Sequence, residues 1–200
     1  MWSVRSYFIV GSVNCDEPLV VLKDALEAGI TMFQLREKGD GALTGAAYEA
    51  FARECQALCR RYRVPFIIND DIALAEKLDA DGIHVGQEDA SFHAYRAQYP
   101  QKIVGVSIHT LRELEQAITD GASYVGIGPI FHTTSKQDVI QSSLTFLQKA
   151  RNAFPHIPIV AIGGITTENA RLVRQAGADG IAVIREIVDS KNIVATVQNL

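Results

Sequence analysis

Eight short apolar segments alternate with eight longer segments of helical periodicity, and this alternation restricts the chain to very few folds. Most of the apolar segments are rich in Val and Ile and are nearly continuous rather than alternating. Such segments are typical of strands that are buried on both faces of a parallel sheet. The expected strands cover residues 7–11, 32–36, 65–69, 82–86, 103–107, 124–130, 158–163 and 180–184.

The longer segments carry apolar residues at three-to-four spacing, which predicts helices; the pattern is weakest in the fourth. Asp71 is a suitable N-cap for the third helix, and Thr110 with Glu113 has the spacing of a capping box for the fifth. Glycines such as Gly29 follow several helices and can adopt the left-handed conformation that ends them. The expected helices cover residues 20–27, 46–61, 72–78, 92–99, 111–118, 144–154, 167–175 and 188–198.

Eight strand–helix units divide the 200 residues into units of about 25 residues, which predicts a closed (β/α)8 barrel, or TIM barrel, as a single domain over residues 1–200. A doubly wound open sheet is the alternative. It normally has fewer units and a glycine fingerprint at its first turn, and this chain lacks that fingerprint. The barrel would gather catalytic groups in the loops at the carboxyl ends of its strands.

Composition and charge exclude several classes of partner. The net charge is −4 with no basic tract, so we expect no nucleic-acid partner. No apolar segment approaches the ~18 residues of a membrane span or forms a signal-peptide core, so we expect a soluble cytoplasmic protein. Three cysteines without matching zinc ligands fit a reducing compartment, where Cys55 and Cys59 would be core residues of one helix face.

A cationic cluster follows the second expected strand. Arg36 and Lys38 are two residues apart, so both side chains can face one ligand, with Gln34 one step deeper. Arginine offers a planar fork to phosphate oxygens and lysine a compact charge. The alternative is a solvated Arg-Glu-Lys turn. We therefore expect substrate contacts in the segment Gln34, Leu35, Arg36, Glu37 and Lys38.

Two later loops also suit anions. The loop after the sixth strand combines hydroxyl groups with a cation in Thr133, Thr134, Ser135 and Lys136. After the seventh strand, Gly163-Gly164 would allow close backbone approach, and the following helix N-terminus would favour an anion. The alternative there is a tight strand-to-helix turn. Two phosphate sites in one pocket would imply two phosphorylated substrates.

Acidic and polar side chains end the neighbouring strands. Asn69 and Asp70 end the third strand and Asp89 follows the fourth, so two carboxylates could share Mg²⁺ together with phosphates and water. Helix capping is the alternative. Ser107 ends the fifth strand, where its hydroxyl could position a substrate. His84 lies within a strand as an expected core histidine directed inward.

Taken together, these motifs resemble those of the thiamine-phosphate synthase (thiamine-phosphate pyrophosphorylase) family. The ordered set extends over nearly the whole chain, and it is more specific than any one of its members. The matching segments are residues 7–12, 34–39, 42–45, 64–71, 80–90, 105–107, 124–130, 159–166 and 175–180.

The resemblance implies a Mg²⁺-dependent transferase on an eight-stranded barrel. Such an enzyme joins a hydroxymethylpyrimidine diphosphate to a thiazole phosphate, with loss of pyrophosphate through a carbocation-like pyrimidine. By position, Asp70 and Asp89 would bind Mg²⁺, and Ser107 would contact the pyrimidine. The groups implied to hold the pyrimidine diphosphate are Gln34, Arg36, Lys38, Asn69 and Lys136, and those around the thiazole phosphate are Thr133, Ser135, Gly164, Ile184 and Arg185. The groups expected to act in catalysis are Arg36, Lys38, Lys136 and Ser107.

The chain departs from the family pattern at a few positions. Ser135 replaces a usual threonine, His132 a common proline and Arg185 a usual serine, and Ser142-Ser143 stands where a glycine is frequent. These differences bear on substrate affinity more than on the type of reaction.

Two other functions remain open on the same barrel. A thiazole tautomerase tends to lack the Asn-Asp pair and to carry histidine at the position of Pro129, so the sequence favours the synthase. A non-catalytic sensor of phosphorylated ligands would have no need of both carboxylates and three cations. The sequence leaves open whether the chain forms a homo-oligomer.

Overall fold

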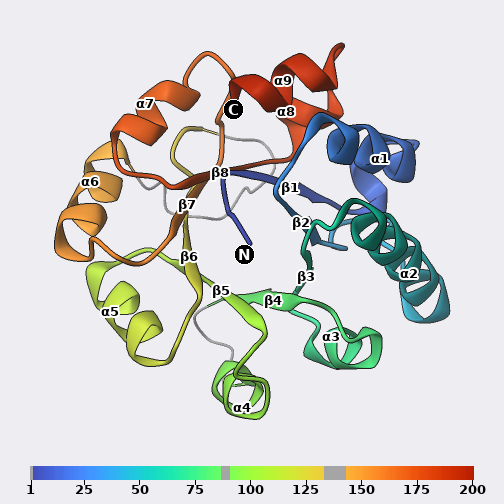
Figure 1. The fold of residues 1–200 in the computed structure, drawn as a ribbon, viewed down its shortest axis with the longest axis horizontal. Coiled ribbons are helices and arrows are strands. Elements are labelled where there is room, and N and C mark those ends of the chain that lie inside the picture. Colours follow the sequence, from blue (N-terminus) through green and yellow to red (C-terminus); the bar gives the residue numbers. More distant parts are fainter. Residues whose placement is uncertain (1, 87–90, 133–142) are drawn as a thin grey trace.

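Eight parallel strands close into a barrel in which each strand pairs with the next and β8 pairs with β1. The computed structural model describes residues 2–86, 91–132 and 143–200. Figure 1 shows the barrel surrounded by its helices. Each strand overlaps its expected segment, so the predicted (β/α)8 barrel is confirmed. The strands are β1 (Ser6–Val10), β2 (Met32–Leu35), β3 (Phe66–Asn69), β4 (Gly82–Val85), β5 (Ile103–Ile108), β6 (Tyr124–Ile127), β7 (Ile159–Ile162) and β8 (Gly180–Val183).

The helices follow the strands with local signals that the sequence carries. The Asp71 carboxylate accepts from the Leu74 N–H (2.9 Å) and the Thr110 hydroxyl from the Glu113 N–H (3.1 Å), as expected of N-caps. The helices are η1 (Ser12–Asn14), α1 (Pro18–Ala28), α2 (Gly45–Tyr62), α3 (Ile72–Leu78), α4 (Ser91–Gln98), α5 (Leu111–Thr119), α6 (Leu144–Ala153), α7 (Ala170–Gln175), α8 (Arg185–Val188) and α9 (Ile193–Asn199).

Several expected boundaries were wrong, among them those of the last helix and the sixth strand. The single helix expected at residues 188–198 is divided into α8 and α9, because the Asn192 side chain accepts from the Ala195 N–H (3.0 Å) and starts a new helix there. The sixth strand ends at Ile127 rather than at residue 130. Pro129 follows and has no N–H to donate to a neighbouring strand.

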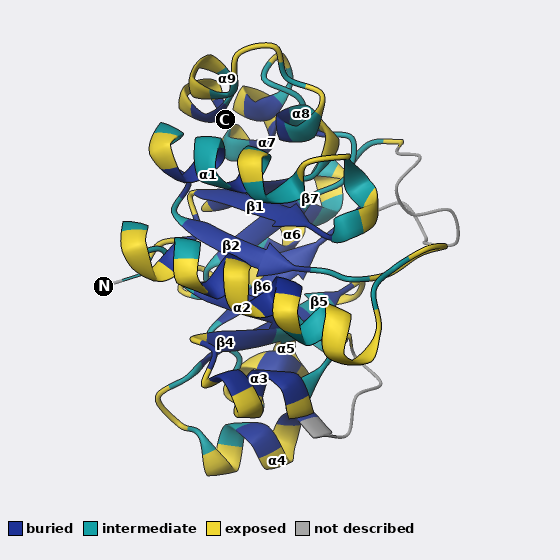
Figure 2. Cartoon of the chain, turned by 90° about the vertical axis from the view of Figure 1, so that its right-hand side faces the viewer, coloured by how far each residue is buried: buried dark blue, intermediate teal, exposed yellow. Residues whose placement is uncertain are grey.

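Two apolar cores lie on the two faces of the barrel wall. Alternate side chains such as Ile9 and Ile67 fill the interior, whereas Phe33 and its stacked neighbour Phe66 pack outward under the helices. Figure 2 shows the strands buried between helices whose outer surfaces are exposed. Cys55 and Cys59 on α2 belong to the outer core, as predicted for core residues.

A repeated polar clamp joins the strands in pairs at their amino ends. The residue directly before each even-numbered strand donates its N–H to the carbonyl of the first or second residue of the preceding strand. Its side chain accepts the N–H of that same residue, and all of these hydrogen bonds are 2.7–3.1 Å long. The polar side chain of each clamp residue thus satisfies a backbone N–H at the start of the preceding strand. The clamp residues are Thr31, Asp81, Ser123 and Asp179.

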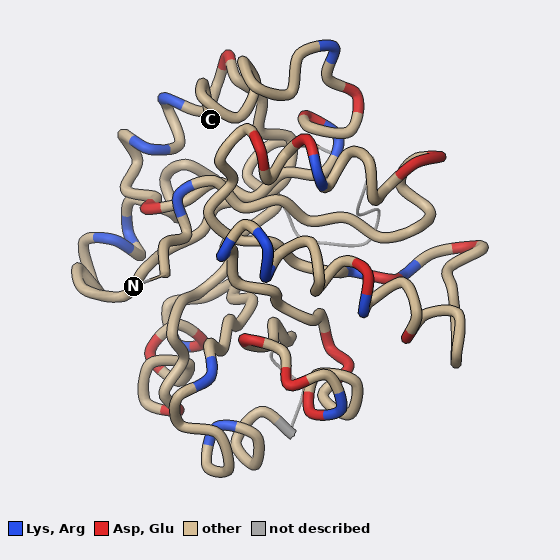
Figure 3. The backbone as a smooth tube through the Cα atoms, turned by 45° about the vertical axis from the view of Figure 1, so that its right-hand side comes forward, with Lys and Arg blue, Asp and Glu red and all other residues tan. Residues whose placement is uncertain are grey.

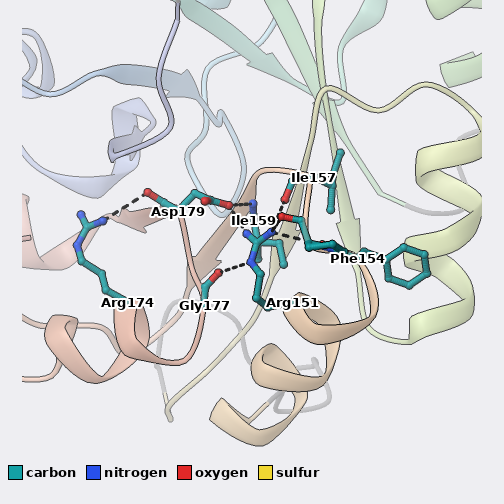
Figure 4. Close-up of polar contacts among 8 residues, drawn as sticks. Arg151, Phe154, Ile157, Ile159, Arg174, Gly177 and Asp179 are labelled. Atoms are coloured by element: carbon teal, nitrogen blue, oxygen red, sulfur yellow. Dashed lines mark hydrogen bonds and ion pairs between the residues drawn. The ribbon is translucent and has the colours of Figure 1, made fainter.

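Arginines reinforce the last two clamps. Arg151 donates to the carbonyls of Gly177 (2.9 Å) and Ile157 (3.1 Å) and forms an ion pair with Asp179 (Figure 4). Arg96 reinforces the clamp at Ser123 by donating to the Ser123 hydroxyl (2.8 Å). The amino end of the barrel is thus fixed by structural contacts, which leaves the carboxyl end for function.

Candidate active site

A pocket is lined by inward-facing residues from all eight strands or the loops that directly follow them, with about 600 Å³ of empty space that includes its open mouth. No described strand contains Lys, Arg, Asp or Glu, so the charged groups of the described residues reach this pocket only from the loops. Figure 3 marks where Lys, Arg, Asp and Glu lie along the backbone. The expected site residues Gln34, Arg36, Asn69, Ser107 and Ile184 all line it. The structure therefore brings together residues that are up to 150 positions apart in the sequence (from 34 to 184).

The segment after β2 divides its residues between the pocket and the scaffold. Gln34 is 2% exposed and, like Arg36, lines the pocket. The Leu35 side chain packs in the outer core and is not among the residues that line the pocket. The Glu37 carboxylate accepts from the N–H groups of Ser12 and Leu43, both at 2.8 Å, and thereby fastens two loops instead of lining the pocket.

Lys38 and Asp70 meet beside the end of β3. Their ammonium and carboxylate groups form an ion pair, and both side chains are partly exposed. Asp70 has a left-handed backbone (φ 59°), which is uncommon outside glycine, asparagine and aspartate and is often found at functional sites. Its N–H donates to the His84 carbonyl (2.9 Å), which fixes this conformation. Asp71 is the helix cap, as predicted.

The donor set around Asp70 fits a metal that is shared with a ligand. Within residues 2–86, 91–132 and 143–200 there is no cluster of three or more His, Cys, Asp or Glu that could form an all-protein cage. Asp70 supplies one carboxylate and Asn69 an amide oxygen at the adjacent position. Mg²⁺ is commonly bound by one or two carboxylates together with phosphates and water. Asp89 lies outside the described residues.

A chain of hydrogen bonds crosses the inner part of the pocket. Gln34 Nε2 donates to the Tyr7 hydroxyl (2.8 Å), which lies 2.7 Å from the Tyr124 hydroxyl. That group lies 3.0 Å from His84 Nδ1, and His84 Nε2 lies 2.9 Å from Ser107 Oγ. We call these five side chains the polar chain. Sequence reasoning placed His84 inward but missed both tyrosines, although each occupies an inward position of its strand.

The loops after β6 and β7 lie against each other. The Phe131 N–H donates to the Gly163 carbonyl (3.0 Å), and a Cβ at Gly164 (φ 63°) would lie 2.5 Å from the His132 carbonyl oxygen. Only glycine therefore fits at residue 164. The space beside residue 164 is therefore occupied by the loop after β6, and a phosphate at Gly164 stays a prediction.

The helix after this loop begins later than expected. α7 starts at Ala170 instead of residue 167, because the Asn169 side chain accepts from the Thr166 N–H (2.9 Å) and Glu186 accepts from the Thr167 N–H (2.8 Å). These two N–H groups are thus committed to internal bonds, and the prediction of a helix N-terminus directly after the Gly-Gly pair was wrong. Thr133, Thr134, Ser135 and Lys136 lie outside the described residues.

Two further residues differ from expectation in position. Arg185 does not line the pocket; its exposed guanidinium lies 3.5 Å from Asp189. His109 lines the pocket, although its place in the sequence, two residues after Ser107 and beyond the fifth strand, favours a solvent-facing loop residue. Its N–H donates to Glu113 (2.6 Å), and its ring Nδ1 lies 3.5 Å from the same carboxylate. The Glu113 side chain of the expected capping box is therefore bound to residue 109.

Comparison with known proteins decides the family. Residues 6–187 match the family model described as thiamine monophosphate synthase. The chain belongs to this family. Proteins named thiamine-phosphate synthase from Lysinibacillus sphaericus and Oceanobacillus iheyensis are 57% and 48% identical to it, over 97% and 98% of the chain and 92% and 97% of their own lengths.

The solved structures agree with this family assignment. Thiamine phosphate pyrophosphorylase from Pyrococcus furiosus superposes with a TM-score of 0.87 at 31% identity, covering 98% of this chain and 93% of its own. These matches confirm the family resemblance that the sequence showed. They also confirm the transferase class that this resemblance implied. Among the described helices, none has the length and apolar character needed to span a membrane.

Proposed function

We propose that this protein is a thiamine-phosphate synthase, which joins a hydroxymethylpyrimidine diphosphate to a thiazole phosphate and releases pyrophosphate. The observation that carries the proposal is the pocket at the carboxyl ends of the strands. It unites Gln34, Arg36, Asn69 and Ser107 in a chain whose relatives bear this name over nearly its whole length. A barrel fold alone supports many activities, so these side chains, and not the fold, indicate the reaction.

The cationic side of the pocket would hold the diphosphate. Arg36 presents its planar guanidinium at the end of β2, and Lys38 adds an ammonium beside Asp70. Fixed positive charges stabilise a leaving diphosphate because its charge grows as the bond breaks. Lys136, which lies outside the described residues, is proposed to contribute a third cation.

Asp70 and Asp89 are the residues that would hold Mg²⁺, with Asn69 as a contact of the diphosphate. When bound, the metal ion neutralises part of the charge on the pyrophosphate. Lys38 is positioned by its ion pair with Asp70, so the carboxylate would orient both the metal ion and the ammonium. Mg²⁺ as the cofactor is part of this proposal.

The bond changes need no protein nucleophile. The carbon–oxygen bond between the pyrimidine methylene and the diphosphate breaks, and its electron pair leaves with pyrophosphate. The amino group of the pyrimidine donates electrons to the methylene, and the thiazole nitrogen lone pair then forms the new carbon–nitrogen bond. Burial raises the pKa of the Cys55 and Cys59 thiols, which lie in the outer core away from the pocket. Neither is suited to attack the substrate.

The opposite side of the pocket is apolar and suits the thiazole. Val160, Ile162 and Ala182 line it, and Ile184 follows β8 at its rim. We propose that the thiazole phosphate lies toward Gly164, with Thr133, Ser135 and Arg185 as further contacts. The contact with Arg185 requires its side chain to leave Asp189, because the two now lie 3.5 Å apart.

One assay separates the candidate functions. Purified protein is mixed with Mg²⁺ and both phosphorylated substrates, and the release of pyrophosphate is followed. Turnover that requires both substrates supports the synthase. Isomerisation of the thiazole without condensation would indicate a tautomerase, and tight binding without any reaction would indicate a sensor. We further propose a cytoplasmic location, supported by three free cysteines.

A further inference from the structure

The polar chain crosses the pocket from β2 to β5, and its central groups have no direct part in the proposed bond changes. It runs from Gln34 through Tyr7, Tyr124 and His84 to Ser107, with every link between 2.7 and 3.0 Å. Five strands contribute one residue each, so the chain depends on barrel closure. Only its two ends coincide with expected substrate contacts.

Its central members are deeply buried. Tyr7 is 2% exposed and Tyr124 is fully buried, and burial raises the pKa of both phenols far above the ordinary value of 10.0. Both hydroxyls therefore keep their hydrogen at neutral pH. A buried hydroxyl that lost its partner would be destabilising, so each one is committed to its neighbour in the chain.

A glycine on β5 makes room for this arrangement. A Cβ at Gly105 would lie 2.1 Å from Tyr124 Cζ and 2.5 Å from His84 Nδ1. The Tyr124 ring also packs edge-on against Tyr7, with centroids 5.9 Å apart. The positions of both rings are thus fixed by packing as well as by hydrogen bonds.

Such a chain has a direction, because each hydroxyl has a single hydrogen to donate. Gln34 Nε2 donates to Tyr7, whereas either hydroxyl can be the donor between Tyr7 and Tyr124, and the role of His84 Nδ1 follows its tautomer. In the arrangement that lets each phenol accept one hydrogen and donate one within the chain, Tyr7 donates to Tyr124 and Tyr124 donates to His84 Nδ1. His84 Nδ1 then acts as an acceptor, and its hydrogen is on Nε2, which donates to Ser107. The hydroxyl hydrogen of Ser107 is therefore directed to an acceptor other than His84.

We propose that Tyr7, Tyr124 and His84 are positioning residues that hold His84 as the Nε2–H tautomer and make Ser107 a hydrogen-bond donor to a ring nitrogen of the substrate. This inference rests on the proposed function, because the aminopyrimidine supplies that ring nitrogen. The chain thereby selects the pyrimidine by its pattern of donors and acceptors. A change in Tyr124 would alter recognition at Ser107 although the two side chains are not bonded to each other.

The tautomer can be measured without any substrate. In protein labelled with ¹⁵N-histidine, the ring nitrogen shifts of His84, assigned with a His84→Gln variant, should show one neutral tautomer with its hydrogen on Nε2 at neutral pH. Tyr124→Phe removes the hydroxyl bound to Nδ1 and should change this pattern. An Nδ1–H tautomer in the unmodified protein, or shifts that Tyr124→Phe leaves unchanged, would overturn the proposal.

Kinetics provide the second readout. Tyr124→Phe should reduce kcat/KM for the pyrimidine diphosphate by about tenfold, as expected for one misdirected hydrogen bond, and should leave KM for the thiazole phosphate unchanged. Tyr95→Phe is the matched control, because Tyr95 is also buried but lies on α4 outside the pocket. An equal loss in both variants, or no loss in Tyr124→Phe, would reject the positioning role.

If Tyr124→Phe fails to fold, Tyr7→Phe interrupts the same chain one link earlier and is measured in the same two ways. The His84 tautomer is observed in the free protein, so it tests the chain even if the unmodified enzyme shows no synthase turnover. Absence of turnover in unmodified protein with the expected tautomer would reject the proposed function alone.

Discussion

Lys38 and Asp70 form an ion pair although they follow different strands of the barrel. Neither side chain is among the lining residues of the pocket, but Asp70 directly follows Asn69, which is, so the pair lies next to the proposed diphosphate and metal site. Asp70 adopts a left-handed backbone there, and the hydrogen bond from its N–H to the His84 carbonyl maintains it. These contacts fix the positions of Lys38 and Asp70 before any ligand binds, as the proposed electrostatic stabilisation of a leaving group requires.

Asp70→Asn should abolish metal-dependent turnover while the protein stays folded. Asparagine tolerates the left-handed conformation, so the backbone should survive and only the negative charge is lost. We expect pyrophosphate release to fall by about 100-fold or more, with little change in thermal stability. Asp79→Asn is the control, because Asp79 also has a positive φ (50°) but caps α3 away from the pocket. Near-normal rates in Asp70→Asn would remove the metal assignment.

Arg36→Lys should raise KM for the pyrimidine diphosphate and lower kcat. Lysine keeps the charge but loses the planar fork that can bind two phosphate oxygens at once. A loss of about tenfold or more in kcat/KM is expected in the same assay. Arg53→Lys, on the exposed surface of α2, should behave as the unmodified protein. Unchanged kinetics in Arg36→Lys would place the diphosphate elsewhere.

The barrel could be predicted because its signals are local. Continuous Val- and Ile-rich runs indicate buried parallel strands, and caps such as Asp71 and Thr110 mark helix starts independently of the rest of the chain. Boundaries failed where a side chain redirected the backbone. Asn169 delays α7 and Asn192 starts α9, and the partners of these side chains depend on the folded loops.

The site was predicted in part for the same reason. The residues at strand ends, such as Arg36 and Ser107, follow from barrel geometry once the strands are known. The role of Glu37 could not be foreseen, since its partner Ser12 is 25 residues away. Tyr7 and Tyr124 were missed because an inward-facing aromatic residue in a strand normally fills the core, and only the closed barrel brings their hydroxyls within 2.7 Å.

Gly105→Ala should destabilise the protein and disturb the pocket. The added methyl group would lie 2.1 Å from the Tyr124 ring, which packing holds in place. We expect a cost of about 1–3 kcal/mol in the free energy of unfolding, measured by chemical denaturation. Gly86→Ala is the matched control, because no atom of the described residues lies within 4 Å of its added methyl and its φ is not positive. Equal stability of the two variants would contradict the packing around Tyr124.

Stability should fall at high pH because of the buried phenols. Burial raises the pKa of Tyr7 above its ordinary value of 10.0, so below pH 10 this phenol is neutral in both the folded and unfolded states. Above that pH only the unfolded state ionises, and the free energy of unfolding should decrease by about 1.4 kcal/mol per pH unit for such a group. Tyr7→Phe should have a shallower slope, whereas Tyr62→Phe, at a half-buried tyrosine whose hydroxyl binds Glu27 at the surface, should change it less. Equal slopes for Tyr7→Phe and unmodified protein would contradict this prediction.

Arg151→Lys should lower stability without changing catalysis in the folded protein. Arg151 binds loop carbonyls before β7 and β8 and pairs with Asp179, and lysine cannot make these separate contacts from one planar group (Figure 4). The loss of several partly buried hydrogen bonds should cost about 1–3 kcal/mol in the free energy of unfolding. Arg171→Lys, at an exposed position of α7, should leave stability unchanged. kcat/KM is compared at temperatures where Arg151→Lys is fully folded. A fall in kcat/KM there would contradict the prediction, because it would show that the amino end of the barrel influences the pocket.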